Sequence, residues 1–258
     1  MNFYKVSLGH RLAVFICSGL LVITSGCLSR QERVLTVYSG RGLKLPVAEL
    51  IKAYEKQEQV VVNVVYAGSH ILLKTIKKSK YGDIFIPGSE HYLEKGGSLI
   101  VEKHPLALHV PAFFAKKGNE KNIKSYADLL KPGVTIGIAN HEMATIGWIA
   151  EQILSKLPPD QSFRHSITSW SSSNAADLFE LLNSGLVDAA LIWSDQIHWE
   201  RGDDLHLITI PAKINYTQQI GVGRLSTSGH EESAKKLFNY IATKGEAIFK
   251  KHGFGVKP

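Results

Sequence analysis

The chain has 258 residues, of which 44% are hydrophobic and 21% are charged, with only two cysteines. These proportions are ordinary for a globular protein, and they exclude a collagen-like, low-complexity or disulfide-dense chain. Lysine and arginine number 30 against 23 acidic residues, a formal net charge of +7, which suits nucleic acid, an anionic membrane or a small anionic ligand without choosing between them.

The first 26 residues have the pattern of an export signal. Lys5 and Arg11 precede an uncharged run over residues 12–23 (LAVFICSGLLVI), and small residues follow just before Cys27. An export signal has such a basic start and an apolar stretch of about 7 to 15 residues, whereas a membrane-spanning helix needs about 20. The segment resembles a bacterial lipoprotein signal, which implies a lipid on Cys27; an ordinary cleaved signal is the alternative.

Export limits the compartment and the partners. We expect a periplasmic or otherwise extracytoplasmic protein, anchored to a membrane by the lipid on Cys27, with a linker over residues 27–33. Cys17 leaves with the signal in this interpretation, so we expect no disulfide. Nucleic acid is not expected as a partner, because the protein is exported and its basic residues form no run of five or more. We expect a monomer.

Strand and helix patterns alternate along the rest of the chain. Runs of β-branched and apolar residues predict strands over 34–38, 60–66, 83–87, 135–139, 166–170 and 189–193, and extended segments over 106–116, 207–210 and 219–224. One-sided apolar patterns predict helices over 43–57, 70–78, 126–130, 147–157, 174–184 and 232–251. Such alternation is typical of mainly parallel sheets flanked by helices.

The alternation restarts partway along the chain, which predicts two α/β lobes. We assign residues 34–108 and 217–258 to the first lobe and residues 109–216 to the second, joined by two crossover strands. A chain that leaves a lobe and returns to it forms a hinged pair with a cleft between the lobes. Ligands of open α/β sheets bind at the carboxyl ends of the strands.

Three turns place small or hydroxyl residues between a predicted strand and a predicted helix. They cover residues 39–42 (SGRG), 67–69 (AGS) and 140–147 (NHEMATIG). The first N–H groups of a helix lack internal partners and carry partial positive charge, and small residues let an anion approach them. One such turn is weak evidence, but three in one exported chain favour an anion-binding site.

The chain resembles the periplasmic molybdate/tungstate-binding proteins of ABC transporters, which have the type II periplasmic-binding-protein fold. Residues 35–43 (LTVYSGRGL) resemble the opening strand and ligand turn of that family, and residues 66–69 (YAGS) resemble its second ligand turn. Residues 82–86 (GDIFI) and the closing helix with KKHGF at 250–254 also resemble it. The resemblance implies an oxyanion, molybdate or tungstate, bound between the lobes and delivered to an ABC permease.

The resemblance also implies ligand-binding residues in the first lobe. Ser69 corresponds to the ligand serine of the second turn. The serine of the first turn falls on Gly42, which has only a backbone N–H to offer, so Ser39 or Arg41 is expected to compensate. An arginine that points inward suits a phosphate or carboxylate group, whereas a surface arginine is the alternative for Arg41.

The remaining implied positions lie in the second lobe. The third ligand position falls on Ile146, beside Thr145, and the fourth falls on Ala175, beside Asn174. The fifth, a tyrosine hydroxyl in the family, falls on Trp193, whose indole N–H can only donate. A deprotonated oxyanion accepts hydrogen bonds, so this replacement is compatible with an anionic ligand.

Other site types find less support in the sequence. The histidines, among them His70, His104 and His109, are scattered without an HxH or HExxH pattern, so we expect no metal cation. There is no GxSxG motif, and we expect no catalytic residue and no cofactor. The alternatives left open are another anion, such as phosphate, sulfate or a phosphorylated or carboxylated metabolite, and, with less support, a metal-cation binder or a periplasmic enzyme.

Overall fold

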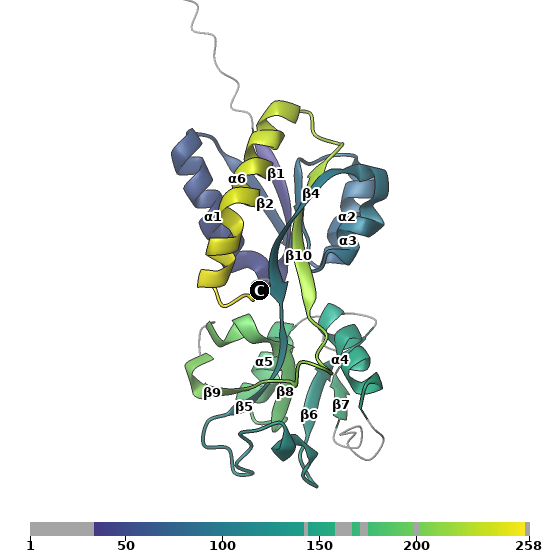
Figure 1. Cartoon of the computed structure of the whole chain (residues 1–258), viewed down its shortest axis with the longest axis vertical. Coiled ribbons are helices and arrows are strands. Elements are labelled where there is room, and N and C mark those ends of the chain that lie inside the picture. The colour runs from purple at the N-terminus through teal and green to yellow at the C-terminus, as the bar shows by residue number, and fades with distance from the viewer. Residues whose placement is uncertain (1–33, 142–143, 158–166, 171–174, 199–201, 256–258) are drawn as a thin grey trace, which may run out of the picture. The chain divides into compact units, whose positions relative to one another are not determined.

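The computed structural model describes residues 34–141, 144–157, 167–170, 175–198 and 202–255. The predicted export signal, Cys27, the linker and Asn174 lie outside these residues. The described strands form two five-stranded sheets accompanied by helices (Figure 1), which confirms the prediction of an α/β protein.

The first sheet contains strands from both ends of the described chain, in the order β2-β1-β3-β10-β4. These strands are β1 (Leu35–Gly40), β2 (Val62–Ala67), β3 (Ile84–Ile86), β4 (Ile100–His109) and β10 (Gln218–Leu225). β1 is parallel to β2 and β3, whereas β10 is antiparallel to both β3 and β4. All strands except β10 therefore run in one direction, as expected for a mainly parallel sheet.

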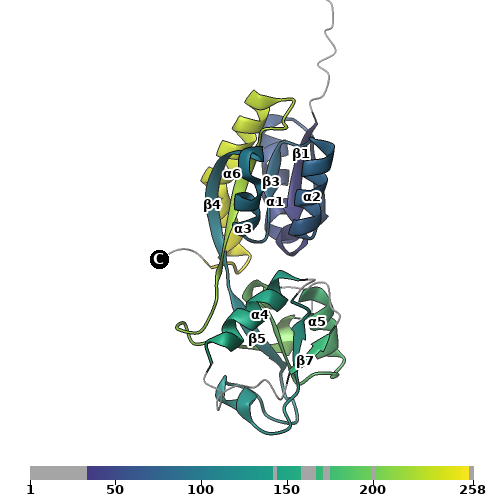
Figure 2. The same cartoon turned by 90° about the vertical axis from the view of Figure 1, so that its right-hand side faces the viewer.

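Both faces of the first sheet are covered by helices, because the buried strands carry apolar side chains on both sides. α1 (Lys44–Glu58), which follows the short 3-10 helix η1 (Arg41–Leu43), and α6 (Glu231–Lys251) pack over the core that contains Val37 and Ile84. α2 (Ser69–Ser79) and α3 (His91–Gly96) cover the opposite core, which contains Tyr38 and Phe85. Figures 1 and 2 show the sheet between these two pairs of helices.

The second sheet repeats this arrangement of strands, in the order β7-β6-β8-β5-β9. Its strands are β5 (Pro111–Lys116), β6 (Ile136–Ala139), β7 (Ile167–Trp170), β8 (Ala189–Trp193) and β9 (Leu205–Ile208). β6 is parallel to β7 and β8, and β5 is the one reversed strand. α4 (Thr145–Ser155) and α5 (Ala175–Asn183) pack against β6 and β8. The described parts of the loops contain the 3-10 helices η3 (Ala127–Leu130), η6 (Ser194–His198) and η7 (Gly202–Asp204).

The same aspartate contact occurs at the amino end of the central strand in each sheet. Asp83, just before β3, accepts a hydrogen bond of 2.7 Å from the amide of Thr36, and Asp188, just before β8, accepts one of 2.7 Å from the amide of Thr135. Partial burial raises the pKa of Asp188, but hydrogen bonds from Lys121 and Thr135 lower it overall. These two carboxylates therefore stabilise the sheets at the end opposite to the one where a ligand is expected.

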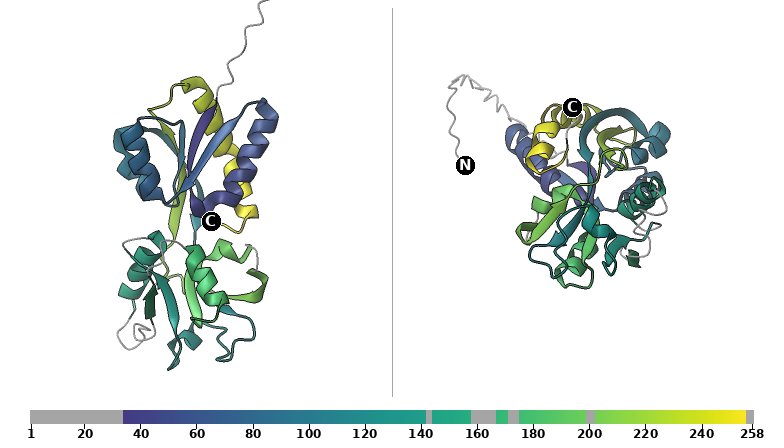
Figure 3. Two further views of the ribbon diagram at one scale, coloured as in Figure 1. Left: turned by 180° about the vertical axis from the view of Figure 1, so that it is seen from behind. Right: turned by 60° about the horizontal axis from the view of Figure 1, so that its bottom comes forward.

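Two segments connect the sheets. Val110 alone separates β4 from β5, and residues 209–217 lead from β9 back to β10 (Figure 3). The side-chain amide of Asn215 donates a hydrogen bond of 3.1 Å to the carbonyl of Pro111, which ties the two segments together. We predict that the two sheets act as lobes that move about these segments.

The strands and helices expected from the sequence are present, with shifted bounds. For example, the strand predicted over 34–38 spans Leu35–Gly40, and the helix predicted over 43–57 spans Lys44–Glu58. Residues 106–116 are extended as predicted, but they belong to two strands, the end of β4 and all of β5, which Val110 separates. The start of β4 at Ile100 was not predicted. The first half of β4 is largely exposed and polar, so it lacks the apolar pattern of a buried strand, and the six-residue α3 was not predicted at all.

Candidate ligand-binding site

Three turns meet at the carboxyl ends of β1, β2 and β3. Gly40 ends β1, Ser69 begins α2 shortly after β2, and Gly88 follows β3. A side-chain carbon placed on Gly40 would lie 3.0 Å from the amide nitrogen of Gly88 and 3.6 Å from the hydroxyl oxygen of Ser69. Glycine at position 40 therefore allows the three turns to approach this closely. The first two turns were predicted as ligand turns from the sequence, and the third was not.

Ser69 lies where these turns meet. Its side chain is 9% exposed, and its hydroxyl oxygen accepts a hydrogen bond of 3.0 Å from the amide of Gly88. A hydroxyl can accept and donate at the same time, and within the described residues Ser69 has no acceptor for its own proton. The contact with Gly88 thus holds the Ser69 oxygen in place and leaves its proton available to a bound group.

Two helices begin at candidate ligand turns without a capping side chain. The residues that precede α2 and α4 are Gly68 and Ala144, and neither provides a side-chain hydrogen bond to the first turn. Serine, threonine, aspartate or asparagine commonly provides that bond and satisfies one of the free amides. Their absence leaves the amides at the start of α2 and α4 free of a side-chain acceptor, which is the arrangement that an anion requires.

The first turn holds three of the predicted site residues. Ser39 is fully buried, and its hydroxyl makes only a long contact of 3.4 Å to the carbonyl of Gly40. Arg41 is exposed, and its side chain forms no ion pair or hydrogen bond with any described residue. Gly42 is partly exposed, and the Cε1 atom of His109 lies 4.0 Å from the position that a side-chain carbon on Gly42 would take. Of these three residues, Arg41 has the most freedom to turn toward a ligand.

In the second sheet, the start of α4 lies directly against the end of β6. A side-chain carbon on Gly147 would lie only 2.4 Å from the carbonyl oxygen of Ala139, so glycine is required for this close contact. Thr145 is partly exposed, whereas the side chain of Ile146 is 2% exposed and belongs to the core of the second sheet. Ile146 can therefore offer a ligand only its backbone.

Trp193, the last residue of β8, contacts the end of β4. Its ring stacks on the imidazole of His109, with 3.6 Å between the centroids and 16° between the planes. Asp195 lies two residues further on, and its Oδ1 atom is 3.1 Å from Nε2 of His109. The predicted site residues Gly42 and Trp193 therefore lie on either side of one histidine.

Neither His109 nor Asp195 was predicted to belong to the site. His109 appeared only as one of several scattered histidines, because the stacking and the ion pair join residues more than 80 positions apart. Of the other predicted positions, Ala175 begins α5, and Asn174 lies outside the described residues. The contacts described here place Ser69 beside Gly88, and Gly42 and Trp193 beside His109. The role of every predicted residue in ligand binding stays a prediction.

The described part of the chain contains neither a cluster of metal ligands nor a helix that could span a membrane. In it, no three histidine, cysteine, aspartate or glutamate side chains lie close enough together to hold a metal ion. None of the described helices is long and apolar enough to cross a membrane. The polar groups that gather at the candidate site are hydroxyl, amide and guanidinium groups, which together can bind an anion.

Known proteins resemble the chain over most of its length. A family model described as bacterial extracellular solute-binding protein matches residues 35–255. A protein of Haemophilus influenzae named "Putative binding protein" is 29% identical over 241 residues, which cover 91% of this chain and 97% of that protein.

Solved structures share the fold at low sequence identity. The substrate-binding domain of a putative molybdenum ABC transporter from Clostridium difficile is 18% identical with a TM-score of 0.73, and the match covers 87% of this chain and 99% of that one. PEB3, a protein of Campylobacter jejuni, was solved with bound L-phospholactate; it is 19% identical with a TM-score of 0.71, covering 86% and 100% of the two chains. One structure is named for a putative molybdenum transporter and the other was solved with L-phospholactate, so the fold alone does not identify the ligand of this chain.

Proposed function

Because the chain belongs to the family of bacterial extracellular solute-binding proteins, we propose that it captures a small oxyanion, molybdate or tungstate, and delivers it to an ABC permease. The ligand binds between the two lobes. Ser69, Gly42 and Arg41, with Ser39 behind them, contact it from the first lobe. The contacts from the second lobe come from Thr145, Ile146, Asn174, Ala175 and Trp193.

The observation that carries this proposal is the arrangement of Ser69. Its oxygen accepts the Gly88 amide at 3.0 Å, so the hydroxyl is fixed and its proton is free to donate. The uncapped starts of α2 and α4 add backbone N–H groups. A fully deprotonated oxyanion accepts hydrogen bonds at all of its oxygens, and neutral donors in a dehydrated site bind it strongly without a counter-charge.

Binding of the anion explains how the protein signals to a permease. An anion that touches groups on both sheets stabilises the arrangement in which the lobes are closed around it. The permease then selects this closed form. In this proposal the protein is not an enzyme, because capture and release need no covalent step, and it works in the periplasm, held to a membrane by the lipid on Cys27.

One observation favours a second candidate, an anion that carries both phosphate and carboxylate groups. Arg41 is exposed and has no partner among the described residues, and a guanidinium group binds phosphate or carboxylate through two parallel hydrogen bonds. PEB3, which has a similar fold, was solved with a ligand of this class. A site that uses Arg41 in this way would prefer phospholactate to molybdate.

A thermal-shift screen of the chain from residue 28 onward tests both candidates. The ligands are molybdate, tungstate, sulfate, phosphate, L-phospholactate and zinc. A ligand present at 100 times its Kd raises the free energy of unfolding by about 2.7 kcal/mol, which is easily measured. A rise with molybdate and tungstate supports the first candidate, and a rise with L-phospholactate alone supports the second. A rise with zinc alone would exclude both.

A further inference from the structure

His109 lies at the junction of the two sheets, between two backbone contacts. On one side, Leu108 exchanges two hydrogen bonds, of 2.7 and 2.9 Å, with Gly255 in the C-terminal turn after α6. On the other side, the carbonyl of Val110 accepts a hydrogen bond of 2.8 Å from the amide of Ser194, just after β8. The side chain of His109 is therefore held between the C-terminal turn and the end of β8.

Described residues surround the imidazole of His109. Trp193 stacks on one face at 3.6 Å, the ring centroid of Phe254 lies 5.2 Å away, and the Gly42 turn is close to its Cε1 atom. Nε2 faces Oδ1 of Asp195 at 3.1 Å, and both side chains are 3% exposed. A histidine from the last strand of the first sheet before the crossover thus meets an aspartate from η6, which follows β8 of the second sheet, out of contact with water.

Buried polar atoms concentrate at this position. Four buried side-chain atoms here have no well-aligned hydrogen bond within the described residues: Nδ1 and Nε2 of His109, Oδ1 of Asp195 and Nε2 of Gln196. Buried polar groups are normally satisfied, and a buried carboxylate without a partner is costly. The contact of 3.1 Å with Nε2 of His109 is therefore the main compensation that the described residues offer to Oδ1 of Asp195.

We propose that His109 and Asp195 form a buried tie between the two sheets, and that through this tie His109 positions Trp193 and the Gly42 turn for ligand binding. The contact of His109 with Asp195 and its stacking on Trp193 support the tie itself. The effect on the ligand rests on the proposed function, in which Gly42 and Trp193 contact the anion. His109 is a positioning residue, because its contacts are with these two groups.

The polar contact between Nε2 and Oδ1 separates this role from simple packing. Stacking and apolar contacts alone would let the Trp193 ring slide across its neighbour, whereas the contact of 3.1 Å between Nε2 and Oδ1 restricts the movement of the imidazole. Because the imidazole stacks on Trp193, its orientation sets that of the indole. A variant that lacks both polar groups of the tie would therefore keep its core and most of its stability but bind its ligand less tightly.

The first experiment needs no ligand. The chain is labelled with 5-fluorotryptophan, and the ¹⁹F resonance of Trp193 is assigned with Trp193→Phe. We expect Asp195→Asn to shift this resonance in the wild-type background and to leave it unchanged in the His109→Phe background, while the resonance of Trp148 stays in place in both. An equal shift in the two backgrounds would mean that Asp195 acts on Trp193 without His109, and it would overturn the tie.

The second experiment separates stability from positioning. His109→Phe leaves the Asp195 carboxylate buried without a partner, so we expect a lower unfolding temperature; His109→Phe with Asp195→Leu removes the charge and restores most of that temperature. We expect both variants to bind the anion that stabilises the wild-type protein at least tenfold more weakly. The control is His104→Phe, an exposed histidine on the same strand, which should change neither quantity.

The outcomes distinguish the two proposals. If affinity recovers together with the unfolding temperature in the double variant, His109 has only a structural role and its positioning role is refuted. If no anion in the screen stabilises the wild-type protein, the proposed function fails. The ¹⁹F experiment and the unfolding temperatures still decide whether His109 and Asp195 form the tie.

Discussion

The hydroxyl oxygen of Ser69 accepts a hydrogen bond of 3.0 Å from the amide of Gly88, and this contact joins the start of α2 to the turn after β3. The residue implied as a ligand by sequence resemblance is thus also fixed by its neighbour. The fixed hydroxyl does not have to be ordered when a ligand binds, which lowers the entropic cost of binding.

Replacing Ser69 with alanine tests its role as a ligand. We expect Ser69→Ala to weaken anion binding by about 1 to 3 kcal/mol, or roughly fivefold to 150-fold in Kd, because a buried donor to a charged group is lost. Isothermal titration calorimetry measures the change. Ser79→Ala, at the exposed end of the same helix, is the matched control. An unchanged Kd for Ser69→Ala would show that the anion binds elsewhere.

Gly147 offers a test of the second sheet. A methyl group at this position would clash with the carbonyl oxygens of Ala139 and Asn140, at 2.4 and 2.5 Å. We expect Gly147→Ala to displace the start of α4 and to destabilise the protein by about 1 to 3 kcal/mol, the usual cost of overpacking, with a clear loss of anion affinity. Urea unfolding and calorimetry report the two effects.

The control for this prediction is Gly229→Ala, because no atom lies within 4 Å of the added carbon there. Gly229→Ala should leave both stability and affinity close to the wild-type values. If Gly147→Ala is destabilised but binds the anion normally, the start of α4 is not part of the ligand site.

Local signals in the sequence were sufficient to predict most of the fold. Val37 and Ile84 belong to short apolar runs, and the one-sided apolar pattern of residues 43–57 identifies a helix. The first half of β4 was missed because its residues, including Lys103 and His104, are exposed and paired only with β10, more than 100 positions later. Pairing between strands so far apart in the sequence cannot be recognised from a local pattern of residues.

The candidate site was predicted only in part, for a related reason. Ser69 was found because its turn resembles a family motif. Gly88 and His109 were missed because their importance comes from contacts: Gly88 with Ser69, and His109 with Trp193 and Asp195. No residue type or spacing in the sequence predicts such contacts, because they form only when the strands are assembled into sheets.

Arg41 distinguishes between the two classes of ligand. It is exposed and unpaired within the described residues, so Arg41→Gln should change stability by less than about 0.5 kcal/mol. For a phosphorylated carboxylate we expect a loss of about 1.5 to 3 kcal/mol in binding, as is usual for hydrogen bonds to charged groups. For molybdate, held by neutral donors, we expect a much smaller loss.

The matched control for Arg41 is Lys44→Gln, which removes an exposed positive charge three residues away, at the start of α1. An equal loss for both variants would indicate a general effect of net charge, and neither variant would then identify a contact. The dependence of Kd on salt concentration checks this point, because long-range attraction is screened by salt and a direct contact is screened less.

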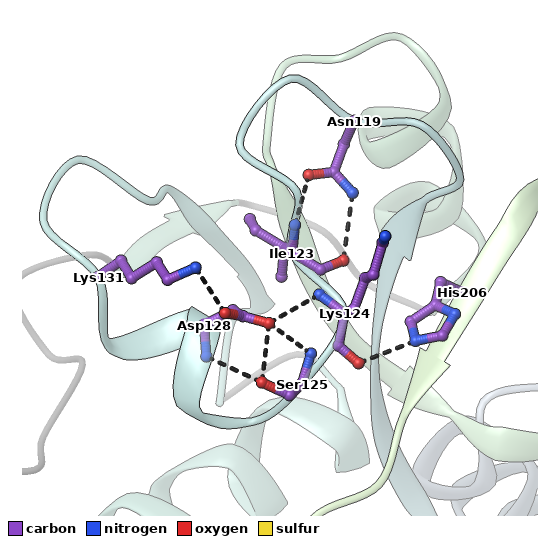
Figure 4. Close-up of polar contacts among 7 residues, drawn as sticks. All are labelled: Asn119, Ile123, Lys124, Ser125, Asp128, Lys131 and His206. Carbon is purple, nitrogen blue, oxygen red and sulfur yellow. Dashed lines mark hydrogen bonds and ion pairs between the residues drawn. The ribbon is translucent and has the colours of Figure 1, made fainter.

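Low pH should destabilise the loop that precedes β6, where Asp128 accepts several hydrogen bonds (Figure 4). An ion pair with Lys131 at 2.6 Å, followed by hydrogen bonds from the amide of Lys124 and from Ser125, holds the pKa of Asp128 well below its usual range. A carboxylate with a lowered pKa in the folded state stabilises the protein above its unfolded pKa, which is about 3.9 for aspartate. That contribution is lost as the pH falls through the lowered folded pKa.

Asp128→Asn should therefore destabilise the protein at pH 7 and at pH 5, and the difference from wild type should shrink as the pH falls below about 4, where the wild-type carboxylate begins to lose its advantage. Urea unfolding at a series of pH values measures this difference. Asp203→Asn serves as the control, because Asp203 is exposed and its carboxylate has no hydrogen bond or ion pair within the described residues. A difference between Asp128→Asn and wild type that stays constant from pH 7 to pH 3 would mean that the charge of Asp128 contributes nothing, and that its hydrogen bonds act through geometry alone.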